Sequence, residues 1–202
     1  MNKPNQKQEN RLFKKGFKYI AGVDEAGRGP LAGPIVAAAV IFKKGVRIKG
    51  INDSKKLSAK QRELLYKKIT EKAYAFSIEK ISARQIDKLG LQKANEKVII
   101  KAVRSLKKKP DFLLIDYFKI NIKIPNKSII KGDEKIFSIA AASILAKVER
   151  DRIMTGYHQK YNNYDFINNM GYGTKKHLQA LKKYGPSSIH RKSFKPFNIF
   201  YK

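Results

Sequence analysis

The stretch that most constrains the fold of this chain is an uninterrupted apolar run, "PIVAAAVIF", over residues 34–42. A run of strand length that follows a proline and carries no charge predicts a buried strand. Just ahead of it, "KYIAGVDEAG" (18–27) has a short apolar core that ends in two acids, and it predicts a second strand. The glycines and prolines between the two runs predict a tight connection.

The rest of the chain alternates strand-like and helical segments. We expect a strand followed by a basic loop over 46–57, and further strands at 74–81 and 111–116. Helical spacing covers 58–73, 91–106, 137–154 and 173–185, and Ser58 is expected to cap the first of these helices. The order predicts an α/β fold in which one mixed sheet is flanked by helices and followed by a helical C-terminal region.

The 202 residues are expected to form a flexible basic tail over 1–17 and one domain over 18–202. The N-terminal segment lacks the apolar centre of a signal peptide, and no apolar run is long enough to cross a bilayer. We therefore expect a cytoplasmic protein without membrane contact, and nothing in the sequence requires more than a monomer.

The charge is strongly one-sided, with 45 Lys and Arg against 16 Asp and Glu and a net charge of +29. A surface of this kind predicts a polyanionic partner, above all nucleic acid. Lysine makes up 36 of the basic residues, so a compositional bias accounts for part of the charge. The chain has no cysteine, so any metal must be held by oxygen or imidazole.

Because acids are scarce, their positions are informative. Asp24 and Glu25 end the first strand, Asp116 ends a later one, and Asp133 lies in a loop before the alanine-rich helix. If the two strands are neighbours, these carboxylates meet, provided that the first strand ends at Asp24 and Glu25 so that both can aim the same way. Clustered oxygen ligands suit Mg²⁺ or Mn²⁺ and metal-assisted phosphodiester chemistry. Taken singly, each acid also fits an ordinary turn or a salt bridge.

Long motifs in this order give the chain a family resemblance. "GVDEAGRGPLAGPIVAAAVIF", "NDSKKLS", "LLID", "KGDEKIFSIAAASILAKVERDRIM", "GYGTKKHLQALKKYG" and "HRKSF" together resemble bacterial ribonuclease HII, the type II ribonuclease H family. The resemblance runs from about residue 18 to residue 194. It implies a ribonuclease H-like fold with a mixed sheet of about five strands.

The resemblance also implies an activity. The expected enzyme hydrolyses the RNA strand of RNA–DNA hybrids and cuts on the 5′ side of single ribonucleotides in duplex DNA, leaving 3′-hydroxyl and 5′-phosphate ends. Two Mg²⁺ or Mn²⁺ ions are expected when substrate is bound. The carboxylates that the resemblance assigns to catalysis and to the metal are Asp24, Glu25, Asp116 and Asp133.

Other positions are implied to bind substrate. Gly27, Arg28 and Gly29 match the segment that reads the ribonucleotide, and Tyr172 matches a tyrosine that contacts its 2′-hydroxyl. Glycines permit close approach to a sugar, and backbone groups can pair with a hydroxyl that both donates and accepts. Without this context, a tight turn with a solvated arginine and an ordinary loop tyrosine explain them better.

Candidate phosphate contacts are less specific, because a solvated basic surface explains the same residues. They are Lys55, Lys56, His190 and Arg191. We expect Asp151 to pair with a nearby arginine rather than to bind metal, and His158 and His177 to be ordinary helix residues. After Asp116 this chain has Tyr117 and Phe118, where the family often has glycine.

Two other classes of function remain open from the sequence. A non-catalytic, basic RNA-binding or ribosome-associated protein on the same fold would use its acids only in salt bridges. The other class is another nuclease of this fold, such as a resolvase or a type III ribonuclease H. The type III enzyme is expected to cleave hybrids but not to cut at single ribonucleotides. The combination of "GRG" with Tyr172 favours type II.

Overall fold

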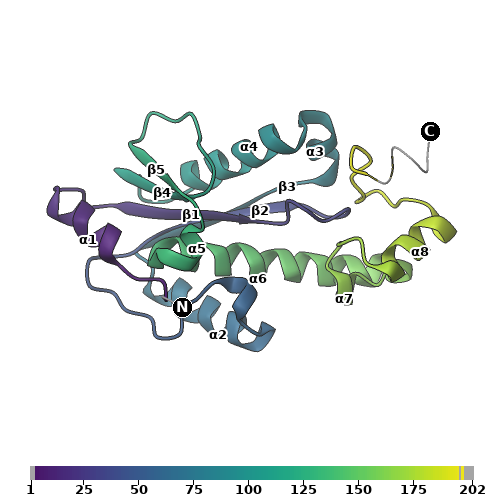
Figure 1. Ribbon diagram of the computed structural model, residues 1–202, viewed down its shortest axis with the longest axis horizontal. Helices are drawn as coiled ribbons and strands as arrows, with labels where there is room; N and C mark the ends of the chain where they lie inside the picture. The colour runs from purple at the N-terminus through teal and green to yellow at the C-terminus, as the bar shows by residue number, and fades with distance from the viewer. Residues whose placement is uncertain (1–2, 196, 198–202) are drawn as a thin grey trace.

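The computed structural model describes residues 3–195 and 197, and its centre is one five-stranded mixed sheet (Figure 1). In the order β3-β2-β1-β4-β5, the first three strands pair antiparallel, while β4 pairs parallel with β1 and with β5. This confirms the expected mixed sheet. The strands are β1 (Ile20–Ala26), β2 (Ile35–Ile41), β3 (Ala75–Ile81), β4 (Phe112–Asp116) and β5 (Asn126–Ile129).

The apolar run at 34–42 becomes β2, which is buried along its whole length. Its side chains alternate between two cores, so Ala37 and Ala39 pack on one face of the sheet and Ala38 and Val40 on the other. Figure 1 shows α3 and α4 on one face and α2 and α6 on the other. Both faces are covered, which explains why β2 lacks the polar alternation of a half-exposed strand.

The expected helices are present, and Ser58 caps α2 through a capping box with Gln61. Short helices that periodicity does not reveal appear at three places, because four to seven residues give too little pattern. The helices are α1 (Lys7–Lys14), α2 (Ala59–Lys72), α3 (Ala83–Leu89), α4 (Leu91–Arg104), α5 (Gly132–Lys135), α6 (Phe137–Lys160), α7 (Phe166–Asn169) and α8 (Lys175–Tyr184), with single 3₁₀ turns at Ser54–Lys56 and Asn162–Tyr164.

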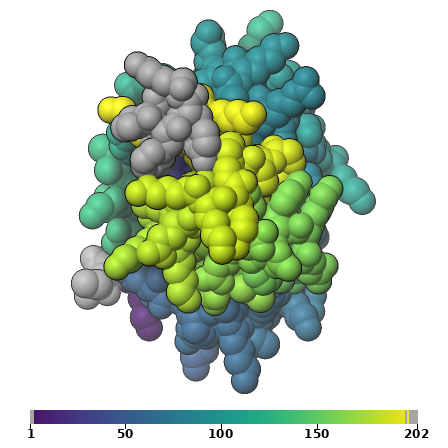
Figure 2. All heavy atoms as spheres, turned by 90° about the vertical axis from the view of Figure 1, so that its right-hand side faces the viewer, coloured from purple at the N-terminus to yellow at the C-terminus, as the bar shows by residue number. Residues whose placement is uncertain are grey.

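The alanine-rich helix α6 lies along the sheet and continues into the C-terminal region. Its first turn approaches β1 so closely that a Cβ on Gly22 would overlap the backbone of Ser138. The far end of α6 carries α7 and α8, and Figure 2 shows these C-terminal residues covering the centre of that end of the molecule. Among the described helices, none is both long enough and apolar enough to cross a membrane.

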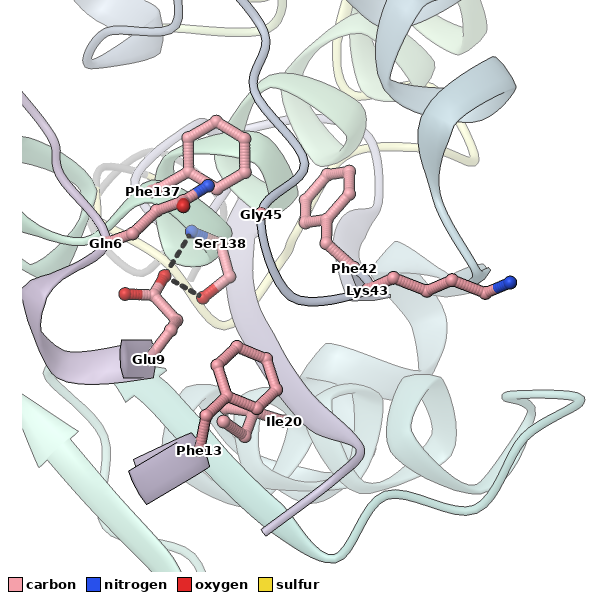
Figure 3. Close-up of a pocket in the computed structure, with 9 residues that line it drawn as sticks. All are labelled: Gln6, Glu9, Phe13, Ile20, Phe42, Lys43, Gly45, Phe137 and Ser138. Carbon is pink, nitrogen blue, oxygen red and sulfur yellow. Dashed lines mark hydrogen bonds between the residues drawn. The ribbon is translucent and has the colours of Figure 1, made fainter. Parts of the chain in front are cut away.

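The N-terminal segment differs from the flexible tail expected over 1–17. Residues 7–14 form α1, because Leu12 contributes to a small apolar cluster and Glu9 is buried against the start of α6. Figure 3 shows the Glu9 carboxylate accepting hydrogen bonds from the amide and hydroxyl groups of Ser138, both 2.9 Å long. The segments expected from the sequence were 1–17 and 18–202. Within them, residues 1, 2, 196 and 198–202 lie outside the described residues.

Two strand assignments need correction. The strand expected at the start of residues 46–57 is absent, because β1 and β3 already occupy both edges of the preceding strand β2. The edge strand β5 (Asn126–Ile129) was missed because its sequence, "NKSI", is short and mostly polar. This strand matters for function, since it leads the chain back to the sheet edge ahead of Asp133.

Candidate active site

Three carboxylates from three separate segments converge at one edge of the sheet. The parallel pairing of β1 with β4 ends at Val23 and Ile115, so Asp24 and Asp116 follow at neighbouring positions. Helix α5 brings in Asp133, and one oxygen from each of the three side chains lies within 4.8 Å of the others. This confirms the prediction that Asp24 and Asp116 meet because their parallel strands end at the same edge of the sheet.

Glu25 is placed differently from the expectation. Strand β1 does not stop at the acids but continues to Ala26, which still pairs with Val36 of β2. Adjacent strand residues therefore keep pointing to opposite faces, with Asp24 toward Ser143 on α6 and Glu25 toward Asn95 on α4. Glu25 lines the same pocket but lies outside the group of three.

The three carboxylates repel one another, and a bound cation would offset this repulsion. Burial raises the pKa of Asp24 well above its usual value, and the charges of Glu25 and Asp116 raise it further. Burial also raises the pKa of Glu25, to about 7, although the nearby Arg28 opposes the shift. An all-oxygen set of mutually repelling carboxylates fits a hard divalent ion such as Mg²⁺ or Mn²⁺, whose charge would stabilise the ionised forms.

The glycine-rich connection after β1 forms the next wall of the pocket. Gly27 has a φ of 95°, and a Cβ at this position would collide with the Arg150 side chain. The ring of Tyr172 lies 3.8 Å from the point where a Cβ of Gly29 would be. The structure thus brings the "GRG" segment and Tyr172 together beside the carboxylates, in a pocket of about 260 Å³.

Two buried arginines hold this connection in place. Arg191 donates to the carbonyls of Gly27, Arg28 and Gly33 over 2.6–3.0 Å. Arg150 donates to those of Ala32, Pro34 and Met170 over 3.0–3.2 Å. Burial lowers the pKa of both guanidinium groups. That of Arg191 falls to about 9, so Arg191 stays charged at neutral pH.

Arg191 was expected to contact phosphate, and the structure corrects this interpretation. Its side chain is fully buried, and its donors are turned inward to backbone carbonyls. The "HR" motif therefore shapes the connection from behind. This role was not predicted from the sequence, and neither was a role for Arg150, which lies between two acids, Glu149 and Asp151.

His190 is not a phosphate contact either, and His177 is more than an ordinary helix residue. Both are buried, and their Nε2 atoms are 3.0 Å apart. The His177 Nδ1–H donates to the Tyr172 carbonyl (2.8 Å), so the His177 Nε2 accepts a hydrogen bond from the Nε2–H of His190. The Nδ1 of His190 in turn accepts from the Ser187 amide (2.9 Å). Each of the four ring nitrogens therefore donates or accepts a hydrogen bond while both imidazoles are neutral. These hydrogen bonds fix the backbone of Tyr172.

Of the two candidate lysines, only Lys55 lies at the pocket. Lys55 lines the pocket and its Nζ lies 3.4 Å from Asp133. Burial lowers its pKa, but attraction to Asp133 and Asp53 outweighs this effect and the net pKa is raised. Lys56 instead pairs with Glu134 at 3.2 Å and does not line the pocket. Asp151 pairs with Lys147 and Arg62, as expected for a structural acid.

Comparison with known proteins agrees with this geometry. A family model described as Ribonuclease HII matches residues 21–197. Ribonuclease HII of a Geobacillus species is 50% identical over 188 residues, 93% of this chain and 68% of that one. Ribonuclease HII of Bacillus velezensis is 52% identical over 192 residues, 95% of this chain and 75% of that one. The ribonuclease H2 crystal structure from Pyrococcus horikoshii OT3 overlays with a TM-score of 0.77 at 26% identity, covering 90% of this chain and 96% of that one.

Proposed function

Because the chain belongs to the ribonuclease HII family and is a ribonuclease H enzyme, we propose that its finer activity is metal-dependent cleavage at single ribonucleotides in duplex DNA, besides cleavage of RNA–DNA hybrids. The cut falls on the 5′ side of the ribonucleotide and leaves 3′-hydroxyl and 5′-phosphate ends. One observation carries the proposal. The "GRG" segment and Tyr172 line the same pocket as the three carboxylates, so recognition of a sugar and cleavage share one site.

In this proposal Asp24, Asp116 and Asp133 hold Mg²⁺ or Mn²⁺, and Glu25 adds a fourth carboxylate from the opposite face of β1. When bound, two such ions would activate a water and offset the charge that develops on the leaving oxygen. The oxygen-only donor set and the raised pKa values of Asp24 and Asp116 support the assignment. Apart from holding the metal, the carboxylates orient the attacking water by accepting its hydrogen bonds.

The remaining pocket residues position the nucleic acid. Backbone groups of Gly27 and Gly29 reach a 2′-hydroxyl, and the Tyr172 ring packs beside the sugar. Arg28 is partly exposed, close enough to Glu25 to pair with it (3.9 Å), and it is the candidate contact for a phosphate. Lys55 offers a second charge at the mouth of the pocket. All of these groups come from one chain, so we propose that the enzyme acts as a monomer. We also propose that it acts in the cytoplasm.

The test uses three labelled duplexes of one sequence, offered to the purified protein with Mg²⁺ or Mn²⁺. They are an RNA–DNA hybrid, a DNA duplex with one ribonucleotide and an all-DNA duplex. We expect cleavage of the first two and none of the third. Cleavage of the hybrid alone would match a type III ribonuclease H and overturn the proposed specificity. Binding without any cleavage would match the non-catalytic alternative.

A further inference from the structure

Two large apolar side chains project into solvent at the edge of the sheet that carries the carboxylates. Ile130 is 67% exposed and Tyr117 is 61% exposed, the highest values among the large hydrophobic residues that the structure describes. They follow the parallel neighbours β5 and β4, and the Tyr117 amide donates to the Ile129 carbonyl over 3.0 Å. We call these two residues the rim pair.

The rim pair is tied to the carboxylate group through the backbone. Tyr117 directly follows Asp116. Two residues after Ile130, the Gly132 amide donates to the Asp116 Oδ1 over 2.6 Å. The rim pair therefore lies next to Asp116 at the ends of β4 and β5.

Packing within the chain does not explain their exposure. Neither residue belongs to an apolar cluster of the described part of the chain. Tyr117 has a φ of 54°, a conformation that costs a residue with a side chain roughly 1 kcal/mol and that glycine adopts freely. Phe118 supports Tyr117 edge-on at 5.8 Å and packs under the Arg28 guanidinium at 4.6 Å. An aromatic ring is thus held outward, at a cost, next to the site.

The surroundings indicate which kind of ligand covers the pair. Three exposed lysines belong to the same part of the chain: Lys127 lies within β5, and Lys119 and Lys131 follow β4 and β5. Apolar and aromatic faces among cations are the pattern that binds a nucleic-acid strand, with rings against bases or sugars and cations near phosphates. We propose that Tyr117 and Ile130 form an additional contact for the substrate strand beside the cleaved bond, packing against a nucleotide base or sugar. This inference rests on the proposed function.

Binding measurements test the rim pair separately from catalysis. The full-length chain with Asp24→Asn, which we expect to leave the substrate uncut, is titrated with a fluorescent RNA–DNA hybrid in Mg²⁺ at several KCl concentrations. Tyr117→Asn removes the ring but keeps a residue that tolerates positive φ. We expect it to weaken binding about tenfold with an unchanged salt dependence, as for loss of a stacking contact. Ile130→Ser should weaken binding in the same way.

Two control variants separate the possible results. Lys131→Asn should lower the salt dependence by about one unit, as for loss of a phosphate contact. Leu64→Ser, at an exposed apolar residue of α2, should change nothing. Unchanged affinity of Tyr117→Asn would overturn the inference, as would sedimentation showing that the parent is a dimer and Tyr117→Asn a monomer. Because hybrid cleavage by the wild-type chain is measured separately, either result leaves the proposed function standing.

Discussion

The guanidinium group of Arg191 donates a hydrogen bond of 2.6 Å to the carbonyl of Gly27, 164 positions away in the sequence. This bond joins the C-terminal region to the connection that follows β1. With the bonds to Arg28 and Gly33, it fixes the backbone that is proposed to read the ribonucleotide. Arg191 is thus a positioning residue, although it touches no solvent.

We expect Arg191→Lys to impair recognition, because an ammonium group cannot reproduce the planar fork that reaches three carbonyls. Unpaired buried carbonyls should lower the free energy of unfolding by about 2–3 kcal/mol. The kcat/KM for a duplex with one ribonucleotide should fall at least tenfold, roughly the effect of 1.4 kcal/mol in the transition state. Lys192→Ala, at the exposed neighbour, serves as the control in denaturation and cleavage assays. Wild-type kinetics in Arg191→Lys would contradict the positioning role.

Tyr172 is expected to contribute through its ring and its hydroxyl separately. Its ring lies beside Gly29 and is about half exposed to the pocket. Tyr172→Phe keeps the ring, so cleavage at a single ribonucleotide should slow by about tenfold, the value of one hydrogen bond. Tyr172→Ala should slow it further. Equal rates for all three proteins would remove Tyr172 from the site.

The bonded imidazoles of His177 and His190 predict a loss of stability in mild acid. Burial, with a smaller effect of His177, lowers the pKa of His190 from 6.5 to about 4. The unfolded chain therefore binds the extra proton between these values, so stability is full above pH 6.5 and falls as the pH drops toward 4. The loss that His190 contributes should be about 3 kcal/mol.

Denaturant unfolding of the wild type and of His190→Gln across this pH range measures the effect. The raised pKa of Glu9 acts in the opposite direction, since burial favours its protonated form in the folded state. Comparing the two proteins cancels that contribution. We expect the stability of His190→Gln to decline less, because His177, whose pKa burial also lowers, is still present. Parallel curves for the two proteins would show that protonation of His190 costs the folded state nothing.

The fold and three of the four carboxylates of the site could be predicted, because they depend on local patterns. The apolar run that forms β2 and the strand ends at Asp24 and Asp116 are visible in the sequence, and parallel pairing joins them. The position of Glu25 was harder to predict, because the direction of its side chain depends on whether β1 ends at Asp24 or continues to Ala26. Only the pairing with β2 decides this.

The buried basic residues could not be predicted from the sequence. In a chain with 45 lysines and arginines, nothing local distinguishes Arg191 from the exposed Lys192 beside it. The distinction comes from carbonyls of residues 27–33, which lack strand partners and need donors. The helix α1 was missed for a similar reason, since a polar segment is ordered there by the tertiary contact between Glu9 and Ser138.

We expect Glu9→Ala to lower the free energy of unfolding by about 1–2 kcal/mol, because two groups at the start of α6 lose their acceptor. Glu9→Gln should cost less, since its amide oxygen can still accept from Ser138. Asn10→Ala on the exposed side of α1 is the control. If Glu9→Ala unfolds like the wild type, α1 does not contribute to stability through this contact.

The most direct test of the central claim joins metal binding to cleavage in one pair of variants. Asp24→Asn removes one of the three converging carboxylates, while Glu71→Gln removes an exposed carboxylate on α2. Mn²⁺ binding is followed by electron paramagnetic resonance, and cleavage is followed on the duplex with one ribonucleotide in Mg²⁺. We expect Asp24→Asn to lose both tight Mn²⁺ binding and cleavage, and Glu71→Gln to retain both. Cleavage at the wild-type rate by Asp24→Asn would contradict the assignment of the active site.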